Sequence, residues 1–478
     1  MLALLIAALL AGCAPSVHLV HPDVHLPDAF EAPRAVPGDN SVTLDRWWQD
    51  FHDPQLDTLI TTAFARSSTA RLAYARIVEA RAVRAQTRAT TLPTGSISGN
   101  ATEQGTKPLW GYSVNQPAYP SAFIGFSPSW ELDLFGRLAK IRQQADLVGA
   151  SATLDYYGTK LALAADIATD LFQARLLATQ LVDAQDRLRI AHDLAQSAAL
   201  GEAHGLTSTQ DAAQLRSDEA SAEAQVAQLS ASLQTAKRQL LILVGEPFAA
   251  TASLTIDPSL CAPPAVPIQT PGVLLARRPD VLSAGLALQS AALKIGLDRL
   301  ALFPKFTIQA NVGVSATASS PAALIFAGGT GVWSIATGLA LPVLDRTALL
   351  AQLRISQAQG QEAAISYEQV VQTAYGEAEN TLTNVATDQL RAGQLDRATT
   401  NARTAFDAAR KGYAAGVTDL TTLLQVERSW LQDRSALNAA RAALLTDTIS
   451  AIRAFGGGWQ PTAVASLAQP QAPDTGSR

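Results

Sequence analysis

The sequence predicts a mainly α-helical chain that also contributes strands to a membrane β-barrel. Three observations lead to this fold class. Three segments alternate between apolar and small polar residues, very long stretches without proline carry heptad repeats, and the second half of the chain repeats the order of elements in the first. We therefore expect long α-helical hairpins that form an α-barrel, and four β-strands per chain.

The N-terminal residues, MLALLIAALLAGCAPS, hold an apolar run of about ten residues, which is too short to span a bilayer as a helix but suits a signal-peptide core. Small residues stand directly before Cys13, as in a bacterial lipobox, where the thiol is acylated and the chain is cut before it. Residues 1–12 are predicted to be a signal peptide and residues 13–40 a lipidated linker, and Ala14 favours the outer membrane. The alternative is a chance cysteine after an uncleaved signal. No Lys or Arg precedes the apolar run, which leaves open a true start upstream of Met1.

The composition argues against several other classes of protein. The chain is 48% apolar, so it can bury a substantial core, and its net charge of −5 with interspersed acids and bases offers no basic face for nucleic acid. Its two cysteines, Cys13 and Cys261, exclude a disulfide framework and a CxxC metal site. Cys261 lies in the predicted loop DPSLCAPP, and we expect it to be structurally unimportant.

Three histidines of the linker have a spacing that could bind a metal if the segment were helical. They are His18, His21 and His25. Pro22 and Pro27 argue against a helix, and no Cys or acidic cluster completes a site. The segment is therefore predicted to be a tether, and neither a metal nor a cofactor is expected.

The elements follow the same order in both halves of the chain. The first structural repeat, 41–246, has a predicted opening helix at 54–90 that begins at the Asp53-Pro54 cap, strands at 94–104 and 122–135, and helices at 137–202 and 206–246. An equatorial connection, 247–271, leads to the second repeat, 272–456, with a helix at 272–302, strands at 305–318 and 331–344, and helices at 346–412 and 417–455. Residues 457–478 form a C-terminal tail. A shift of 211 residues places Gly205 on Gly416, Gln214 on Gln425 and Gly245 on Gly456, which indicates internal duplication.

Three of the four predicted strands, at 122–135, 305–318 and 331–344, have one apolar face and one small or polar face. In FTIQANVGVSATAS, the alternate residues from Phe306 to Ala318 are apolar, and Thr, Gln, Asn, Gly and Ser lie between them. This pattern suits transmembrane barrel strands, although a soluble sandwich strand shows the same alternation, and the lipobox favours the membrane. Lipid requires a closed sheet, and four strands are too few to close one. The barrel must therefore be shared between subunits.

The long helices carry heptad seams rich in alanine. The first seam is Leu177, Leu181, Ala184, Leu188, Ala191, Ala195 and Ala198, and the second is Val226, Leu229, Leu233, Ala236, Leu240 and Leu243. At ~1.5 Å per residue, a helix over 137–202 would be roughly 100 Å long, several times the thickness of a membrane. An ordinary cytosolic coiled coil is the alternative, but it would not alternate with glycine-rich strands. We therefore expect these helices to continue the wall of the β-barrel beyond the membrane.

The sequence contains none of the common catalytic motifs. HExxH, GxSxG, a Walker loop and a complete GxGxxG are absent, and the nearest match, GGTGVW at 328–333, precedes a predicted strand. Glu377 and Glu379 could be read as paired carboxylates, but on a long charged helix they are expected to be solvated or to join helices. We predict that the chain is not an enzyme. A pore-free, lipid-anchored scaffold is the third class, and patterning alone does not exclude it.

Several motifs in order resemble those of TolC-like outer-membrane efflux channels, in particular the lipoprotein (NodT-type) branch. They are WELDLFGRL, RRPDV at 277–281, LALPVLDRTALLAQLRISQAQ, YAAGVTDLTTLLQVERSWL and AFGGGW at 454–459. The resemblance implies a homotrimer whose twelve-stranded β-barrel continues into a periplasmic α-helical tunnel. It also implies a Gram-negative outer-membrane location and partnership with a periplasmic adaptor protein and an inner-membrane RND transporter. A type I protein secretion channel is the alternative within this family, and the exported substrate is not evident.

The hairpin tips are the first candidate site. HGLTS at 204–208 and AGVTD at 415–419 occupy equivalent places, each with a glycine that can end a helix. They resemble the tips through which family members touch the adaptor. The implied contact residues are Gly205, Leu206, Thr207, Gly416, Val417 and Thr418. Plain turn chemistry would also select the two glycines.

The second candidate site is a periplasmic gate on the helix after the second tip. In related channels, an Asp with nearby Leu and Arg forms a constricting ring, and matching TLLQVERSW to that pattern selects Thr421, Gln425 and Arg428. Gln425 stands in place of the Asp and Thr421 in place of the Leu, so we expect Gln425 amides from three chains and Arg428 to hold the closed state through hydrogen bonds rather than ion pairs. Glu427 is expected on a different helix face. Polar surface residues without a gating role are the alternative.

Overall fold

The structure is a computed structural model that describes residues 22, 24–32, 44–105, 119–266, 270–325 and 327–459. Cys13, His18 and His21 lie outside the described residues. The chain forms two compact units. We call Met1–Pro22, Val78–Ser151 and Gly285–Tyr367 the strand unit, and Asp23–Ile77, Ala152–Ala284 and Glu368–Arg478 the hairpin unit. Each predicted repeat contributes to both units.

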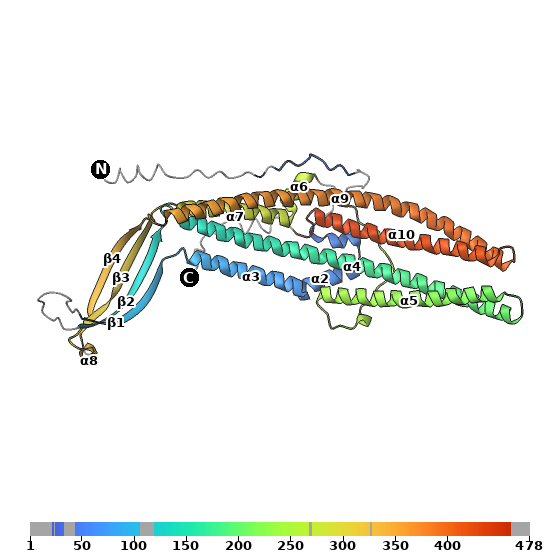
Figure 1. Ribbon diagram of the computed structural model, residues 1–478, viewed down its shortest axis with the longest axis horizontal. Helices are drawn as coiled ribbons and strands as arrows, with labels where there is room; N and C mark the ends of the chain where they lie inside the picture. The colour runs from blue at the N-terminus through green and yellow to red at the C-terminus, as the bar shows by residue number, and fades with distance from the viewer. Residues whose placement is uncertain are drawn as a thin grey trace. The chain divides into compact units, whose positions relative to one another are not determined.

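The strand unit contains one antiparallel sheet with the order β1-β2-β3-β4 (Figure 1). The strands are β1 Thr94–Gln104, β2 Tyr119–Leu132, β3 Lys305–Thr317 and β4 Thr330–Ala340. A short helix, α8 Pro321–Leu324, precedes β4. Among the described residues, β1 and β4 each pair on one side only, so this part of the chain forms a sheet with two open edges.

The register confirms the predicted alternation across the whole sheet. One row of cross-strand neighbours is Ile97, Phe126, Val312 and Trp333. The next row, which points to the other face, is Ser98, Gly125, Gly313 and Val332. Most of the large apolar residues therefore gather on one face of the sheet, and small or polar residues line the other except at a few positions, Phe123 and Val332 among them.

Two strands end earlier than expected. β2 ends at Leu132 rather than at 135, because Asp133 instead caps the following helix by accepting hydrogen bonds from the N–H groups of Leu138 and Ala139, both at 2.9 Å. Gly136 has a φ of 76° in this connection. β4 ends at Ala340 rather than at 344, and Pro342 in the unpaired segment cannot donate a ladder hydrogen bond.

The long helices form as predicted. They are α4 Arg137–Ala203, α5 Thr209–Val244, α9 Arg346–Ala414 and α10 Leu420–Ala454. The ends of α4 and α9, at Ala203 and Ala414, are 211 residues apart, and so are the starts of α5 and α10. In the hairpin unit, the predicted seam residues of α4 and α5 are all buried or half-buried. The heptad pattern thus identified the packed faces correctly.

The two shorter helices are each broken, which the sequence analysis did not predict. The expected helix 54–90 is α2 Pro54–Arg66 followed by α3 Ser68–Ala89, and the expected helix 272–302 is α6 Pro271–Arg277 followed by α7 Pro279–Leu300. The breaks fall at Ser67 and Arg278, again 211 residues apart. At Arg278 the cause is Pro279, since the residue before a proline avoids the helical conformation.

Within the hairpin unit, a glycine packs against each break. Gly245 follows α5 with a φ of 91°, and a Cβ on it would lie 2.6 Å from the carbonyl carbon of Arg66. Gly456 follows α10 with a φ of 72°, and a Cβ on it would lie 2.8 Å from the carbonyl oxygen of Arg277. Both the left-handed conformation and the close backbone contact require glycine. This explains a break at Ser67, where neither proline nor glycine stands in the local sequence.

The core of the hairpin unit joins the short and long helices. Trp47 and Phe51 of η1 Leu44–Phe51 pack with Phe172 of α4, and Asp53, which caps α2, forms a buried ion pair with Arg175. The short η2 Thr251–Ser253 follows α5. Cys261, which we expected to be structurally unimportant, is half-buried and packs against this core, and burial raises the pKa of its thiol.

The last part of the predicted linker also packs on the hairpin unit. Phe30 stacks on Tyr375 of α9 with ring centroids 5.7 Å apart and meets Phe455 edge-on at the same distance. The N–H of Glu31 donates to Glu379 Oε2 at 3.2 Å. The chain around Phe30 is therefore fixed to the end of the second hairpin by its own side chain.

Candidate functional site

The tip of the first hairpin is a tight turn between α4 and α5. Gly205 has a φ of 70°, and its N–H donates to Glu202 O at 3.0 Å, while the N–H of Leu206 donates to Gly201 O at 2.8 Å. This pair of hydrogen bonds is a Schellman motif, which satisfies the last carbonyl groups of the helix. Ser208 then caps α5 by accepting from the N–H of Asp211 at 3.0 Å.

The tip of the second hairpin has the same geometry. Gly416 has a φ of 71°, its N–H donates to Tyr413 O at 2.9 Å, and the N–H of Val417 donates to Gly412 O at 2.8 Å. Asp419 caps α10 by accepting from the N–H of Thr422 at 2.9 Å, and this hydrogen bond is the main cause that lowers the pKa of Asp419. The two tips predicted to be equivalent are therefore built alike.

A second glycine in each tip was missed by the sequence analysis. A Cβ on Gly201 would lie 2.2 Å from Thr207 Oγ1, and one on Gly412 would lie 2.3 Å from Thr418 Oγ1. The threonines thus fold back over the helix end and become half-buried. The signal is present in the sequence, because GEAHGLT and GYAAGVT share the pattern G-x3-G-[L/V]-T at the 211-residue offset.

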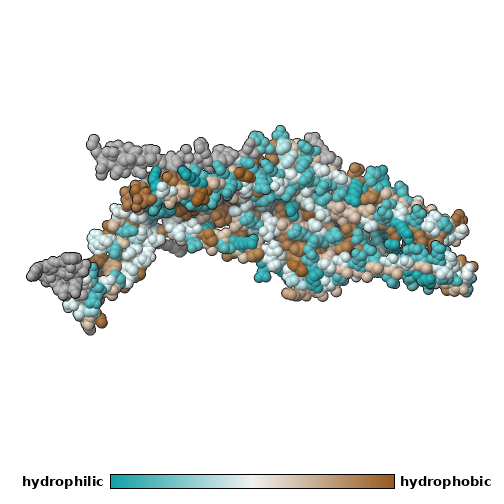
Figure 2. Space-filling view, viewed as in Figure 1, coloured by the Kyte–Doolittle hydropathy of each residue, from teal (hydrophilic) through white to brown (hydrophobic). Residues whose placement is uncertain are grey.

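Each tip presents one apolar side chain to solvent. Leu206 and Val417 are both 84% exposed, although a turn needs no aliphatic residue at this position. Hydrophobic surface is visible at the free ends of the two hairpins in Figure 2. The tips therefore offer two matched apolar points that are available for contact with another protein.

The first turns of α10 pack against the first hairpin. Leu420 and Leu424 contact a small buried cluster formed by α4 and α5. The predicted gate residues Thr421, Gln425 and Arg428 are all exposed, as expected for one helix face. Glu427 is buried on another face, as predicted.

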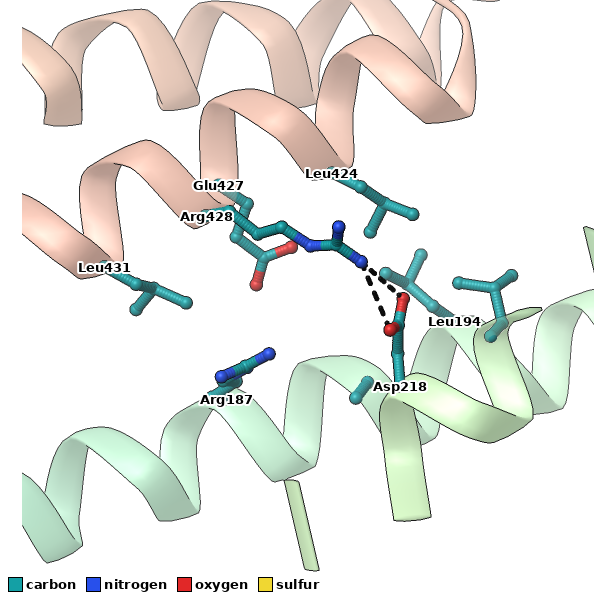
Figure 3. Close-up of a pocket in the computed structure, with 9 residues that line it drawn as sticks. Arg187, Leu194, Asp218, Leu424, Glu427, Arg428 and Leu431 are labelled. Carbon is teal, nitrogen blue, oxygen red and sulfur yellow. Dashed lines mark hydrogen bonds and ion pairs between the residues drawn. The ribbon is translucent and has the colours of Figure 1, made fainter. Parts of the chain in front are cut away.

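Arg428 has a carboxylate partner within its own chain. Its Nη2 lies 3.2 Å from Asp218 Oδ1 and 3.1 Å from Asp218 Oδ2 (Figure 3). Within one chain, Arg428 is therefore held by an ion pair, and the hydrogen bonds expected between Gln425 amides of three chains and Arg428 stay a prediction. The motif around Arg428 lies entirely in α10, whereas Asp218 belongs to α5. Helix packing brings the Asp218 side chain close to Arg428.

Further charges line the small cavity beneath this ion pair. Glu427 of α10 and Arg187 of α4 border the same cavity as Arg428 and Asp218, together with leucines of α4, α5 and α10 (Figure 3). Burial raises the pKa of Glu427, Arg187 and Arg428 oppose the rise, and Asp218 adds to it. This cluster is a polar link between the second hairpin and the first.

The other acidic residues singled out from the sequence have structural partners. Glu377 accepts a hydrogen bond from Arg278 Nη2 at 2.8 Å, and Glu379 accepts one from the N–H of Glu31. They connect segments of the hairpin unit, which agrees with the expectation that these two residues join helices. Within the described ranges, no group of three His, Cys, Asp or Glu residues could hold a metal ion.

Comparison with known proteins agrees with this architecture. A family model described as outer membrane efflux protein matches residues 59–246 and 270–457, one range in each half of the chain. The chain is 29% identical to the pyoverdine export outer membrane protein OpmQ of Pseudomonas putida, with 87% of this chain and 88% of that protein covered. It is 28% identical to the toluene efflux pump outer membrane protein TtgC of Pseudomonas putida, with 95% and 94% covered.

A solved structure of the outer-membrane channel OprN is also similar. The identity is 28% and the TM-score is 0.81, with 92% of this chain and 100% of the OprN chain covered. The fold is therefore that of the TolC-like channels, as the motifs predicted. Because the family model covers most of the sequence, the chain belongs to the outer membrane efflux protein family.

Proposed function

We propose that the protein is the outer-membrane channel of a tripartite efflux system and works as a homotrimer. The observation that carries this proposal is the four-stranded sheet with one apolar face and two open edges. Lipid does not tolerate an open edge, and three such sheets would close a twelve-stranded barrel. The apolar face would then meet lipid and the polar face would line the lumen.

The tips are proposed to contact a periplasmic adaptor protein, which would connect the channel to an inner-membrane RND transporter. Leu206 and Val417 support this proposal, because each is an exposed aliphatic residue on a rigid turn that costs little ordering entropy on binding. Two equivalent tips per chain would give six contact points in a trimer. Drugs or other small molecules of the periplasm are the proposed cargo.

The membrane anchor is proposed to be double. Acylation of Cys13 would hold the N-terminus in the outer membrane, and the barrel strands would hold the rest of the chain there. Support for the lipid comes from the lipobox pattern alone. Radiolabelled palmitate should enter the wild-type protein but not a Cys13→Ser variant, and equal labelling of both would contradict the anchor.

Two measurements on the full-length protein test the channel. The purified protein should have the native mass of a trimer in detergent and should give discrete conductance steps in planar bilayers. A pore-free scaffold would give none, and that result would overturn the proposal. A strain that lacks the protein should regain resistance to its exported drug when the wild-type chain is supplied.

The adaptor contact is tested by the double variant Leu206→Asp and Val417→Asp. Charges on both tips should abolish efflux and leave trimer assembly and conductance unchanged. Phe248→Asp is the matched control, because Phe248 is 99% exposed in the hairpin unit but lies outside both tips. Unchanged drug resistance in the double variant would refute adaptor contact through the tips.

The gate is proposed to be the first turns of α10, with Thr421, Gln425 and Arg428 facing the tunnel axis. The ion pair of Arg428 with Asp218 would hold the second hairpin against the first in the closed state. Arg428→Ala should then raise the single-channel conductance and sensitise cells to a large antibiotic such as vancomycin. Arg441→Ala is the control, since Arg441 of α10 pairs with Asp396 of its own hairpin at 2.7 Å. If Arg428→Ala and Arg441→Ala behave alike, the constriction lies elsewhere.

A further inference from the structure

The polar face of the sheet carries one aromatic side chain in its middle that the pattern does not predict. Most residues of this face are Ser, Thr, Asn, Gln or Gly. Phe123 of β2 lies on it, paired with Asn100 of β1 and Ser315 of β3. Tyr119, four residues earlier on the same strand, shares the face and is 50% exposed.

The ring of Phe123 rests on two glycines. A Cβ on Gly125 would lie 2.3 Å from its Cζ, and a Cβ on Gly313 of β3 would lie 2.8 Å from its Cε2. Gly125 and Gly313 are direct cross-strand partners, so the ring spans the space above two neighbouring strands. Any other residue at either position would displace the ring, and Val332 of β4 stands beside Gly313 in the same row.

This arrangement fixes the ring without burying it. Phe123 itself is half-buried, while Gly125 beneath it is buried. An apolar ring whose surface stays in contact with water is unfavourable in proportion to its exposed area, and the Ser and Thr side chains of the same face expose less apolar surface. A held aromatic face instead offers stacking to planar solutes and attraction to cations.

We propose that Phe123 is a contact site for planar aromatic cations on the lumen wall of the β-barrel. This inference rests on the proposed function, because the trimer turns the polar face inward and places three such rings around the lumen. Each ring presents its free face to the lumen, and its electron-rich surface favours a cationic aromatic solute over an aliphatic cation of similar charge. The site would slow such molecules during exit and bias the channel toward them.

Block of the ionic current by added cations tests the site in reconstituted wild-type trimers. Ethidium is the aromatic probe and tetrabutylammonium the aliphatic one. Phe123→Leu keeps an apolar side chain but removes the ring, and should shorten ethidium block events about two- to tenfold, as expected from the loss of one stacking contact. Tetrabutylammonium block and open conductance should not change.

Three further variants complete the design. Phe123→Trp should lengthen ethidium block, because indole binds cations more strongly than phenyl. This variant keeps the test available if Phe123→Leu does not assemble. Phe126→Leu on the apolar face of the same strand is the control and should leave both kinds of block unchanged. Gly125→Ala should displace the ring and shorten ethidium block.

The outcomes separate this inference from the function on which it rests. Wild-type trimers without conductance would overturn the channel and the contact site together. Conducting trimers in which ethidium block is the same for wild type, Phe123→Leu and Phe123→Trp would overturn the contact site alone, and Phe123 would then only cover the two glycines.

Discussion

The two hairpins are held together differently at equivalent levels. In the first hairpin, His192 of α4 pairs with Glu219 of α5, whereas in the second hairpin a tryptophan of α10 stacks on a phenylalanine of α9. Trp430 stands 211 residues after Glu219. Its ring centroid lies 4.9 Å from that of Phe406, and Arg403 Cζ lies over the Trp430 ring, 4.8 Å from its centroid. His192 Nδ1 and Glu219 Oε1 form an exposed pair at 2.7 Å. The two hairpins have equivalent tips, 211 residues apart, but are joined at this level by different chemistry.

The hairpins differ again further from their tips. Leu177 and Ala236 pack against the core between α4 and α5. The equivalent positions of α9 and α10 hold Asp388 and Asp447, whose side chains share a hydrogen bond. The two repeats are therefore alike where a left-handed glycine or a close backbone contact is required, namely at the tips and at the helix breaks. The side-chain contacts between the paired helices differ. The second hairpin, which carries the proposed gate, combines the stacked rings of Trp430 and Phe406, here called the aromatic clamp, with the titratable pair Asp388 and Asp447.

The largest effect is expected when the clamp is removed. Trp430→Ala would leave a cavity next to Phe406 and remove the cation–π contacts of Arg403 and Arg434. The free energy of local unfolding of the hairpin formed by α9 and α10 should therefore fall by about 3–5 kcal/mol. Glu219→Ala at the equivalent position should have no measurable effect, because exposed ion pairs contribute little. Hydrogen exchange of both hairpins in the intact trimer measures this, and equal losses in the two variants would contradict the comparison.

Glycines with nearly the same φ should differ in their tolerance of alanine. Gly245→Ala combines a left-handed conformation with overlap against the backbone of Arg66, and should destabilise the protein by about 2–3 kcal/mol. Gly205→Ala has the same conformational cost but open space around it, so about 1 kcal/mol is expected. Thermal denaturation of the purified variants compares them. Equal shifts in Tm would show that contact with the break at Ser67 contributes nothing.

The smallest effect concerns pH and the second hairpin. Burial, aided by Asp388, raises the pKa of Asp447 from its ordinary value of 3.8 to about 6. The folded hairpin thus binds this proton more tightly than the unfolded chain, so the contribution of Asp447 to stability is greatest below pH 3.8 and is lost as the pH rises through about 6. Arg391 Nη1 lies 4.0 Å from Asp388 Oδ1, and the pair is partly exposed to water. Both effects reduce the expected loss in the free energy of unfolding to about 1 kcal/mol.

A matched variant copies the first hairpin into the second. Asp388→Leu with Asp447→Ala reproduces Leu177 and Ala236, and should remove the change in stability between pH 4 and pH 7. Hydrogen exchange at both pH values, corrected for the intrinsic exchange rate, measures this in α10. A pH dependence that persists in the double variant would assign it to another group, such as the buried Glu427.

Periodicity was sufficient to predict the strands, their faces and the long helices, because burial repeats along each element. Pro279 was a visible signal for the break at Arg278 that the 272–302 prediction overlooked. The break at Ser67 has no local signal, since it depends on the approach of Gly245 from a distant helix end. The ion pair between Arg428 and Asp218 was missed for the same reason, as helix packing joins residues that are 210 positions apart.

The central claim, that three copies close one barrel, can be tested at the open edges of the sheet. In a Cys261→Ser background, Ser98→Cys on β1 would be combined in turn with cysteine at four β4 positions on the same face, namely Thr330, Val332, Ser334 and Ala336. If three copies close one barrel, at least one combination should form disulfide-linked dimers and trimers in the outer membrane, with no larger species. Absence of a crosslink in every combination, or a ladder that continues beyond three chains, would contradict it.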